Sequence, residues 1–215
     1  MSTYRDRTDA GGQLAAVLAS RSWRDPLVLG LPRGGAPVAA GVASALDAPL
    51  DVVVARKLGA PGRPELGVGA IAEGDALVVD EATLRGLGVT EDELAQTIAA
   101  EREELRRRVD LYRGVRLLPA LVGRDVVVVD DGLATGVTAE AALLGLRALG
   151  ADRLVLAVPV GTPSGVRRLE ATADEVICVV APAELRAVGQ WYDDFRQTTD
   201  DEVLALLSRA HPSRP

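Results

Sequence analysis

Aromatic residues, cysteine and histidine are scarce in this chain of 215 residues. Aromatic residues make up 3% of it, so a hydrophobic core has to be built mainly from Val, Leu and Ala. The single cysteine, Cys178, excludes a disulfide framework and a cysteine-based metal cluster, and it fits a reducing, cytoplasmic setting. The single histidine, His211, lies in a proline-rich tail, which argues against histidine-based catalysis.

Long apolar runs and an excess of positive charge are also missing. No run of about 18 apolar residues occurs, so we expect neither a signal peptide nor a membrane span. The net charge of −7 disfavours a nucleic-acid surface as the main function. An apolar content of 48% with 26% charged residues is typical of a globular protein, and the length fits one domain, 1–215.

Short aliphatic runs alternate with helical stretches along the chain. Six runs are continuously apolar, as expected for strands buried on both faces: 26–31, 50–55, 75–80, 125–130, 153–160 and 175–180. Helices are expected at 35–46, 137–149 and 163–170, and a long charged helix runs from the capping-box residues Thr90 and Glu93 to about Tyr112. This alternation predicts an α/β fold with a doubly wound parallel sheet, whose core spans about 26–180.

The stretch VVVVDDGLATGVTA, residues 126–139, has the strongest chemical signal. Its Val residues indicate a buried strand, and the following helix has free N-terminal amides that favour an anion such as a phosphate monoester. Asp130 and Asp131 would repel that phosphate unless they bind hydroxyls or a Mg²⁺ ion of the same ligand. A ribose 5-phosphate group offers both features. The alternative is a strand-to-helix turn in which the Asp and Thr residues only form caps.

This stretch resembles the 5-phosphoribosyl-1-diphosphate (PRPP) motif of type I phosphoribosyltransferases, and it is most similar to the adenine phosphoribosyltransferase form. The resemblance covers residues 26–160. It implies transfer of the phosphoribosyl group of PRPP to a nucleobase-like acceptor by a cytoplasmic homodimer of nucleotide salvage, with Mg²⁺ as cofactor. Mg²⁺ would be held at Asp130 and Asp131 through the ligand or water. The implied PRPP-binding residues are Asp130, Asp131, Gly132, Ala134, Thr135, Gly136, Val137 and Thr138.

One position of the motif bears on the acceptor base. In hypoxanthine-guanine enzymes, the position of Ala134 is an Asp that acts as general base. The alanine in this sequence therefore argues against a 6-oxopurine substrate.

The segment PRGG, residues 32–35, fits the same ligand. It resembles the pyrophosphate loop of the family, which implies that Arg33 and the amides of Gly34 and Gly35 bind the diphosphate. The resemblance also implies a cis peptide bond between Pro32 and Arg33. The alternative is that the two glycines simply begin a helix after a tight turn.

Lys57 is the only lysine in a sequence whose other cations are all Arg. Lysine and arginine are not interchangeable at sites where charge develops, so a lone lysine is a functional candidate. By resemblance, the segment ARKLGAPG opens a mobile loop: Arg56 and Lys57 would meet the leaving pyrophosphate, and residues 58–69 would form a lid that excludes water. The alternative is the chance survival of one lysine on a solvated turn.

Weaker signals lie outside these loops. Glu73 is a catalytic candidate because adenine phosphoribosyltransferases have a Glu near the base, although it also reads as a strand-turn residue. Trp191 and Tyr192, followed by Phe195, are candidates for stacking on the base, or they anchor the C-terminal segment on the sheet. The terminal segments 1–25 and 181–215 are expected to form a small hood.

One departure from the family pattern leaves the function open. The segment 82–119 adds a long helix to the family pattern. A regulatory protein that senses PRPP with little or no turnover is the alternative function, and an unrelated sugar-phosphate binding protein is a third. The retained Lys57 and lid residues favour the enzyme.

Overall fold

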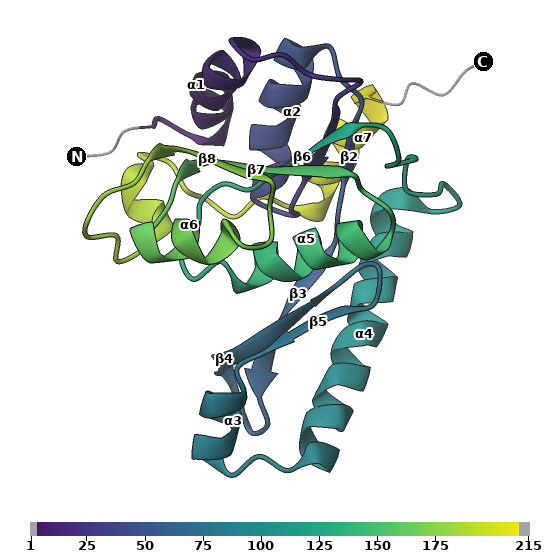
Figure 1. Cartoon of the computed structure of the whole chain (residues 1–215), viewed down its shortest axis with the longest axis vertical. Coiled ribbons are helices and arrows are strands. Elements are labelled where there is room, and N and C mark those ends of the chain that lie inside the picture. The colour runs from purple at the N-terminus through teal and green to yellow at the C-terminus, as the bar shows by residue number, and fades with distance from the viewer. Residues whose placement is uncertain (1–3, 211–215) are drawn as a thin grey trace.

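The computed structural model describes residues 4–210, so His211 lies outside the described part of the chain. Its centre is a parallel sheet of five strands in the order β2-β1-β6-β7-β8 (Figure 1). The strands are β1 (Leu27–Gly30), β2 (Leu50–Val52), β6 (Asp125–Val129), β7 (Arg153–Val160) and β8 (Glu175–Val180). The order reverses between β1 and β6, because successive strands are added outward on either side of this pair. Ligands of such sheets bind at the carboxyl ends of the strands beside this reversal.

Helices cover both faces of the central sheet, which confirms the doubly wound fold. Figure 1 shows α1 (Arg7–Ala19) and α2 (Gly35–Leu46) on one face and α5 (Val137–Ala148) and α6 (Pro163–Leu169) on the other. Alternate residues of the buried strands point into separate apolar clusters: Val127 and Val129 pack on the α2 side, whereas Val126 and Val128 pack on the α5 side.

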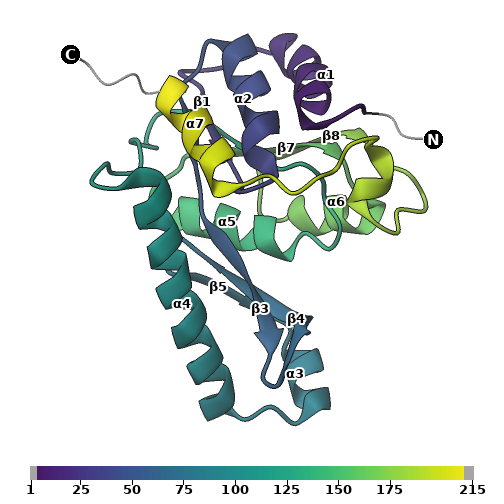
Figure 2. The ribbon, with the colours of Figure 1, turned by 180° about the vertical axis from the view of Figure 1, so that it is seen from behind.

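The remaining elements form a projection that we call the arm, residues 55–113. It consists of the antiparallel strands β3 (Ala55–Ala60), β4 (Arg63–Ala72) and β5 (Ala76–Val79), followed by α3 (Glu81–Leu87) and α4 (Glu91–Arg113). Figures 1 and 2 show the arm extending beyond α5, away from the central sheet. The apolar run at 75–80 therefore belongs to the arm, and its assignment to the parallel sheet was wrong. Residues 58–69 lie within a β-hairpin whose turn holds Pro61 and Gly62, so a lid would have to be this hairpin rather than an irregular loop.

The long helix of the arm, α4, begins as expected. Thr90 and Glu93 form a reciprocal capping box, in which each side chain bonds to the backbone amide of the other residue. Leu94, Ile98 and Leu105 pack into the apolar cluster that also contains Leu58 of β3. The helix is therefore fixed along one side of the three-stranded sheet (Figure 2).

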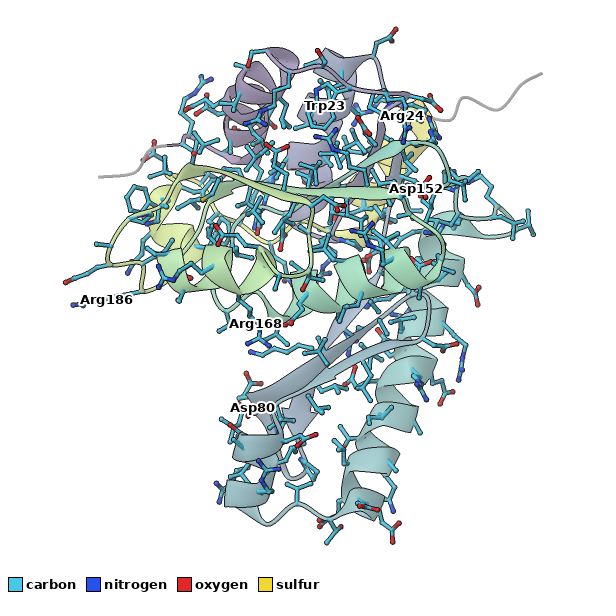
Figure 3. The ribbon with its side chains drawn as sticks, in the orientation of Figure 1. Trp23, Arg24, Asp80, Asp152, Arg168 and Arg186 are labelled. Atoms are coloured by element: carbon cyan, nitrogen blue, oxygen red, sulfur yellow. The ribbon has the colours of Figure 1, made fainter. Side chains whose placement is uncertain are left out.

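The segment after β5 lies on the α6 side of the molecule (Figure 3). Asp80 caps α3 and lies on the arm below Arg168 of α6 (Figure 3). Hydrogen bonds from Thr83 hold the pKa of the Asp80 carboxyl below its usual value, and the charge of Arg168 adds to this effect.

The N-terminal and C-terminal segments contact each other, and the C-terminal helix also packs on two other helices. α7 (Asp200–Ala210) contacts α2, β2 and α4, and the hydroxyl of Tyr112 donates to Asp200. Tyr4 forms an isolated parallel bridge with Tyr192, which follows the short 3₁₀ helix η1 (Val188–Trp191). Among residues 4–210, no helix combines the length and apolar character needed to span a membrane.

Candidate functional site

Two loops that follow neighbouring strands meet at the edge of the central sheet. We call residues 32–35, after β1, the Gly loop, and residues 130–138, after β6, the Asp loop. A Cβ atom added to Gly34 would clash with the carboxylate of Asp131, and one added to Gly35 would lie 2.5 Å from the carbonyl oxygen of Val129. Only glycine allows the two loops to come this close. The structure therefore brings the Gly loop residues together with the two aspartates, as expected, and the Pro32–Arg33 peptide bond is cis.

The Asp loop leads directly into the N-terminus of α5. Gly136 has a φ of +80°, a conformation that favours glycine, and α5 begins at the next residue. Leu133 anchors the middle of the loop, because its amide donates to the carbonyl of Val160 over 2.8 Å. Ala134 and Thr135 are exposed and lie between this anchor and the start of α5. The arrangement presents the free amides of a helix N-terminus to solvent, which suits a phosphate group.

The two carboxylates of the Asp loop are costly to ionise together. Asp130 accepts a hydrogen bond from the amide of Asp131 at 2.8 Å. Burial, and then the charge of Asp131, raise the pKa of Asp130 well above its usual value. Burial also raises the pKa of Asp131, although the charge of Arg7 opposes this shift. Hydroxyl donors or a cation would stabilise the ionised pair.

Arg7, the first residue of α1, contacts the Asp loop and was not predicted from the sequence. Its Nε donates to Oδ2 of Asp131 at 2.7 Å, and the two side chains are only 11% and 15% exposed. Its Nη1 donates to the carbonyl of Arg196 at 2.7 Å, and its guanidinium lies 3.9 Å from the ring centre of Phe195. No local pattern could have revealed this cation, because 124 residues separate it from its carboxylate partner.

The C-terminal aromatic residues pack on the Asp loop. The hydroxyl of Tyr192 donates to the carbonyl of Asp131 at 2.5 Å, and its ring lies 5.3 Å from that of Tyr4 and 4.9 Å from that of Phe195. Tyr192 is 5% exposed. These contacts favour the anchoring role over an open stacking surface for Tyr192. Trp191 beside it is half-buried and stays a candidate for contact with a base.

Arg56 and Lys57 point to opposite sides of the arm, because neighbouring residues of a strand alternate between faces. Arg56 forms an ion pair with Glu101 of α4, with 2.5 Å between Nη2 and Oε2. Lys57 is exposed and lies over Gly67 of β4. Within residues 4–210, no hydrogen bond or ion pair joins either cation to the Asp loop.

Glu73 lies at the root of the arm and has a buried partner. Its carboxylate contacts Arg113, with 2.6 Å between Oε2 and Nη1, and accepts the amide of Val54 at 2.8 Å. Its carbonyl lies against Gly145, near the end of α5 that is remote from the Asp loop. The structure thus does not bring Glu73 to the aspartates, and its contacts support the strand-turn alternative.

A metal ion could be held only with help from a ligand. Within the described residues, no three His, Cys, Asp or Glu side chains converge in a way that could hold a metal. Asp130 and Asp131 supply two neighbouring carboxylates. This set suits Mg²⁺, which typically uses one or two carboxylates and takes its other ligands from substrate phosphates and water.

Comparisons with known proteins agree on one family. Residues 6–194 match the family described as "Phosphoribosyl transferase domain". "Putative phosphoribosyl transferase Rv0571c" of Mycobacterium tuberculosis (strain ATCC 25618 / H37Rv) is 51% identical over 214 residues, which are 98% of this chain and 48% of that protein. The chain thus spans about half the length of the curated relatives it matches.

Solved structures give the same result for the fold. TT1426 from Thermus thermophilus has a TM-score of 0.80 at 47% identity, and the match covers 97% of this chain and 99% of that one. AQ2163 from Aquifex aeolicus has a TM-score of 0.52 at 15% identity, with coverage of 85% and 78%. The second match is a likeness of fold alone.

Proposed function

This chain belongs to the phosphoribosyl transferase domain family, and we propose on this basis that it transfers the 5-phosphoribosyl group of PRPP to a nitrogenous base and releases pyrophosphate. The observation that carries the proposal is the meeting of the Asp loop and the Gly loop at the reversal of strand order. One loop has groups for a diol and a phosphate monoester, and the other has two glycine amides beside a cation. PRPP carries all of these features in one molecule.

Each part of PRPP has a proposed place. The carboxylates of Asp130 and Asp131 would accept the ribose hydroxyls, and the 5-phosphate would bind the loop from Gly132 to Thr138 at the start of α5. Arg33 and the amides of Gly34 and Gly35 would hold the diphosphate. Bound Mg²⁺ would neutralise part of the charge of the diphosphate as it leaves.

The reaction needs no protein nucleophile. The bond from the anomeric carbon to the diphosphate breaks, with its electron pair leaving on pyrophosphate, while the base nitrogen bonds to that carbon and loses a proton. The protein contributes by positioning the two reactants and by stabilising the negative charge that develops on pyrophosphate. Lys57 and Arg56 would add to this once the arm hairpin closes over the ligand.

The acceptor is proposed to be an adenine-like base rather than a 6-oxopurine, since Ala134 replaces the Asp of the latter enzymes. Homodimer formation, cytoplasmic location and a role in nucleotide salvage also remain proposals drawn from the resemblance.

The test combines binding and turnover on the purified chain. With PRPP, Mg²⁺ and a panel of nucleobases, we expect pyrophosphate release with at least one base. Asp130→Asn and Asp131→Asn should weaken PRPP binding by about 1–3 kcal/mol in calorimetry, the usual cost of a poorly matched buried polar group. Asp92→Asn, an exposed residue at the start of α4, is the control and should bind as the wild type does.

Two outcomes would change the proposal. Unchanged PRPP affinity in both Asp loop variants would remove the assignment of the site. PRPP binding without pyrophosphate release with any base would instead assign the chain as a PRPP sensor, an outcome that fits the engagement of Arg56 with α4.

A further inference from the structure

Arg7 occupies the space between the two loops of the site. Its Nε lies 2.7 Å from Oδ2 of Asp131, and it would lie 3.2 Å from a Cβ atom added to Gly34. The guanidinium is therefore next to both the carboxylate proposed for a ribose hydroxyl and the amides proposed for the diphosphate. A ligand that bridges the two loops has to meet this side chain.

Arg7 has one carboxylate as a direct partner, and its charge also acts on Asp130 and Glu202, whose pKa values it lowers. Its hydrogen bonds and ring contact join it to one carboxylate, that of Asp131, and to two neutral groups, the carbonyl of Arg196 and the ring of Phe195. A carboxylate that already accepts Arg7 has fewer lone pairs for a sugar hydroxyl. Arg7 and the ribose thus compete for Asp131.

The surroundings allow the side chain to shift. Arg7 lines a cavity of about 270 Å³ between the starts of α1 and α2 and the segment 194–209. Pro37 of α2 forms part of the same wall, only two residues after the Gly loop. The cavity gives the side chain room to leave Asp131, and Nε of Arg7 already lies beside Gly34 of the Gly loop.

We propose that Arg7 binds the diphosphate of PRPP and that Asp131 passes from Arg7 to a ribose hydroxyl when PRPP binds. The inference rests on the proposed PRPP site. A guanidinium matches phosphate oxygens with two parallel hydrogen bonds, so the diphosphate is a stronger partner for Arg7 than one carboxylate oxygen. α1 would then contribute directly to the substrate site.

This exchange predicts different effects on two ligands that share the ribose and the 5-phosphate. PRPP has the diphosphate, so Arg7→Met should weaken its binding at least about tenfold. Ribose 5-phosphate lacks the diphosphate, so removal of the competitor for Asp131 should leave its binding unchanged or tighter. A side chain that only clamps the C-terminal segment would weaken both ligands equally when removed.

Calorimetry of the full chain with PRPP and with ribose 5-phosphate tests the proposal. Arg7→Lys keeps the charge and should recover part of the PRPP affinity, and Arg7→Gln replaces the Met variant if that variant does not fold. Arg5→Met is the matched control, because Arg5 lies on the same segment, is 82% exposed and pairs with Asp9. It should bind both ligands as the wild type does.

Each result of this experiment supports or overturns a stated claim. Weaker PRPP binding with unchanged or tighter ribose 5-phosphate binding supports the exchange. Parallel losses for both ligands, or unchanged PRPP binding, overturn it. A wild-type chain that binds neither ligand contradicts the proposed function itself, which is a different failure.

Discussion

Removing Glu73 should destabilise the fold and leave the PRPP site intact. The carboxylate of Glu73 is 11% exposed and pairs with Arg113, which is 4% exposed and also donates to the carbonyl of Val52 at 2.7 Å. Glu73→Ala removes the closer ion pair of this buried guanidinium, while Asp51 stays 3.9 Å from its Nε. Breaking a buried ion pair in this way costs about 3–5 kcal/mol. This is a large share of the roughly 5–15 kcal/mol that stabilises a typical native protein.

A double-mutant cycle measures the effect. Urea unfolding of Glu73→Ala, Arg113→Met and the double variant should show two large single losses and a double loss smaller than their sum, because the two side chains contact each other directly. The buried Asp51 keeps Arg116 at 3.5 Å in all three variants. Glu103→Ala, on the exposed side of α4, serves as the control and should unfold as the wild type does. PRPP affinity of the folded variants should stay at the wild-type value, since Glu73 lies away from the Asp loop.

One pattern of results would refute this reasoning. If Glu73→Ala kept its free energy of unfolding within about 1 kcal/mol of the wild type while turnover fell a hundredfold, Glu73 would be a catalytic residue after all.

Three further predictions concern single positions. Gly34→Ala places a Cβ atom against the carboxylate of Asp131 and should lower PRPP affinity at least about tenfold in calorimetry. Gly12→Ala, which has open space around it, is the control and should not lower the affinity. Equal affinities of the two variants would show that the loops separate freely. Lys57→Ala should lower the turnover rate more than PRPP affinity, because an interaction made in the transition state affects the rate; equal losses would make Lys57 a binding residue. Burial raises the pKa of the Cys178 thiol to about 11, so its alkylation at pH 8 should be on the order of a hundredfold slower in the folded chain than in urea; equal rates would mean that the thiol is not protected.

The elements that the sequence predicted best have local signals. The helix expected at 35–46 has these same bounds in α2, and the long helix after Thr90 begins with the expected capping box. The Asp loop was readable for the same reason, because its strand, glycines and helix start are consecutive. Such features depend on neighbours in the chain, so the residues that define them are visible together.

The features that the sequence did not predict depend on distant partners. The apolar run at 75–80 has the composition of a buried strand, but composition does not say which strand it pairs with, and β4 rather than the central sheet is its neighbour. Arg56 was likewise predicted to meet a ligand, but its guanidinium pairs with Glu101, which is 45 residues away in the chain. The structure thus brings the two expected loops together, whereas the approach of Arg7 of α1 and of Glu101 of α4 had no signal in the sequence.

Helix α5 links the Asp loop to the root of the arm. Gly136 lies at the end that faces the Asp loop, and Gly145 lies nine residues along, where a Cβ atom would clash with the carbonyl of Glu73 at the root of the arm. At a rise of about 1.5 Å per residue, these points are roughly 13 Å apart on a stiff rod. Helix α5 is thus a rigid connection between the loop proposed for the phosphate and the root of the arm. A substitution at Gly145 would therefore change the contact between α5 and the arm without altering any residue of the Asp loop.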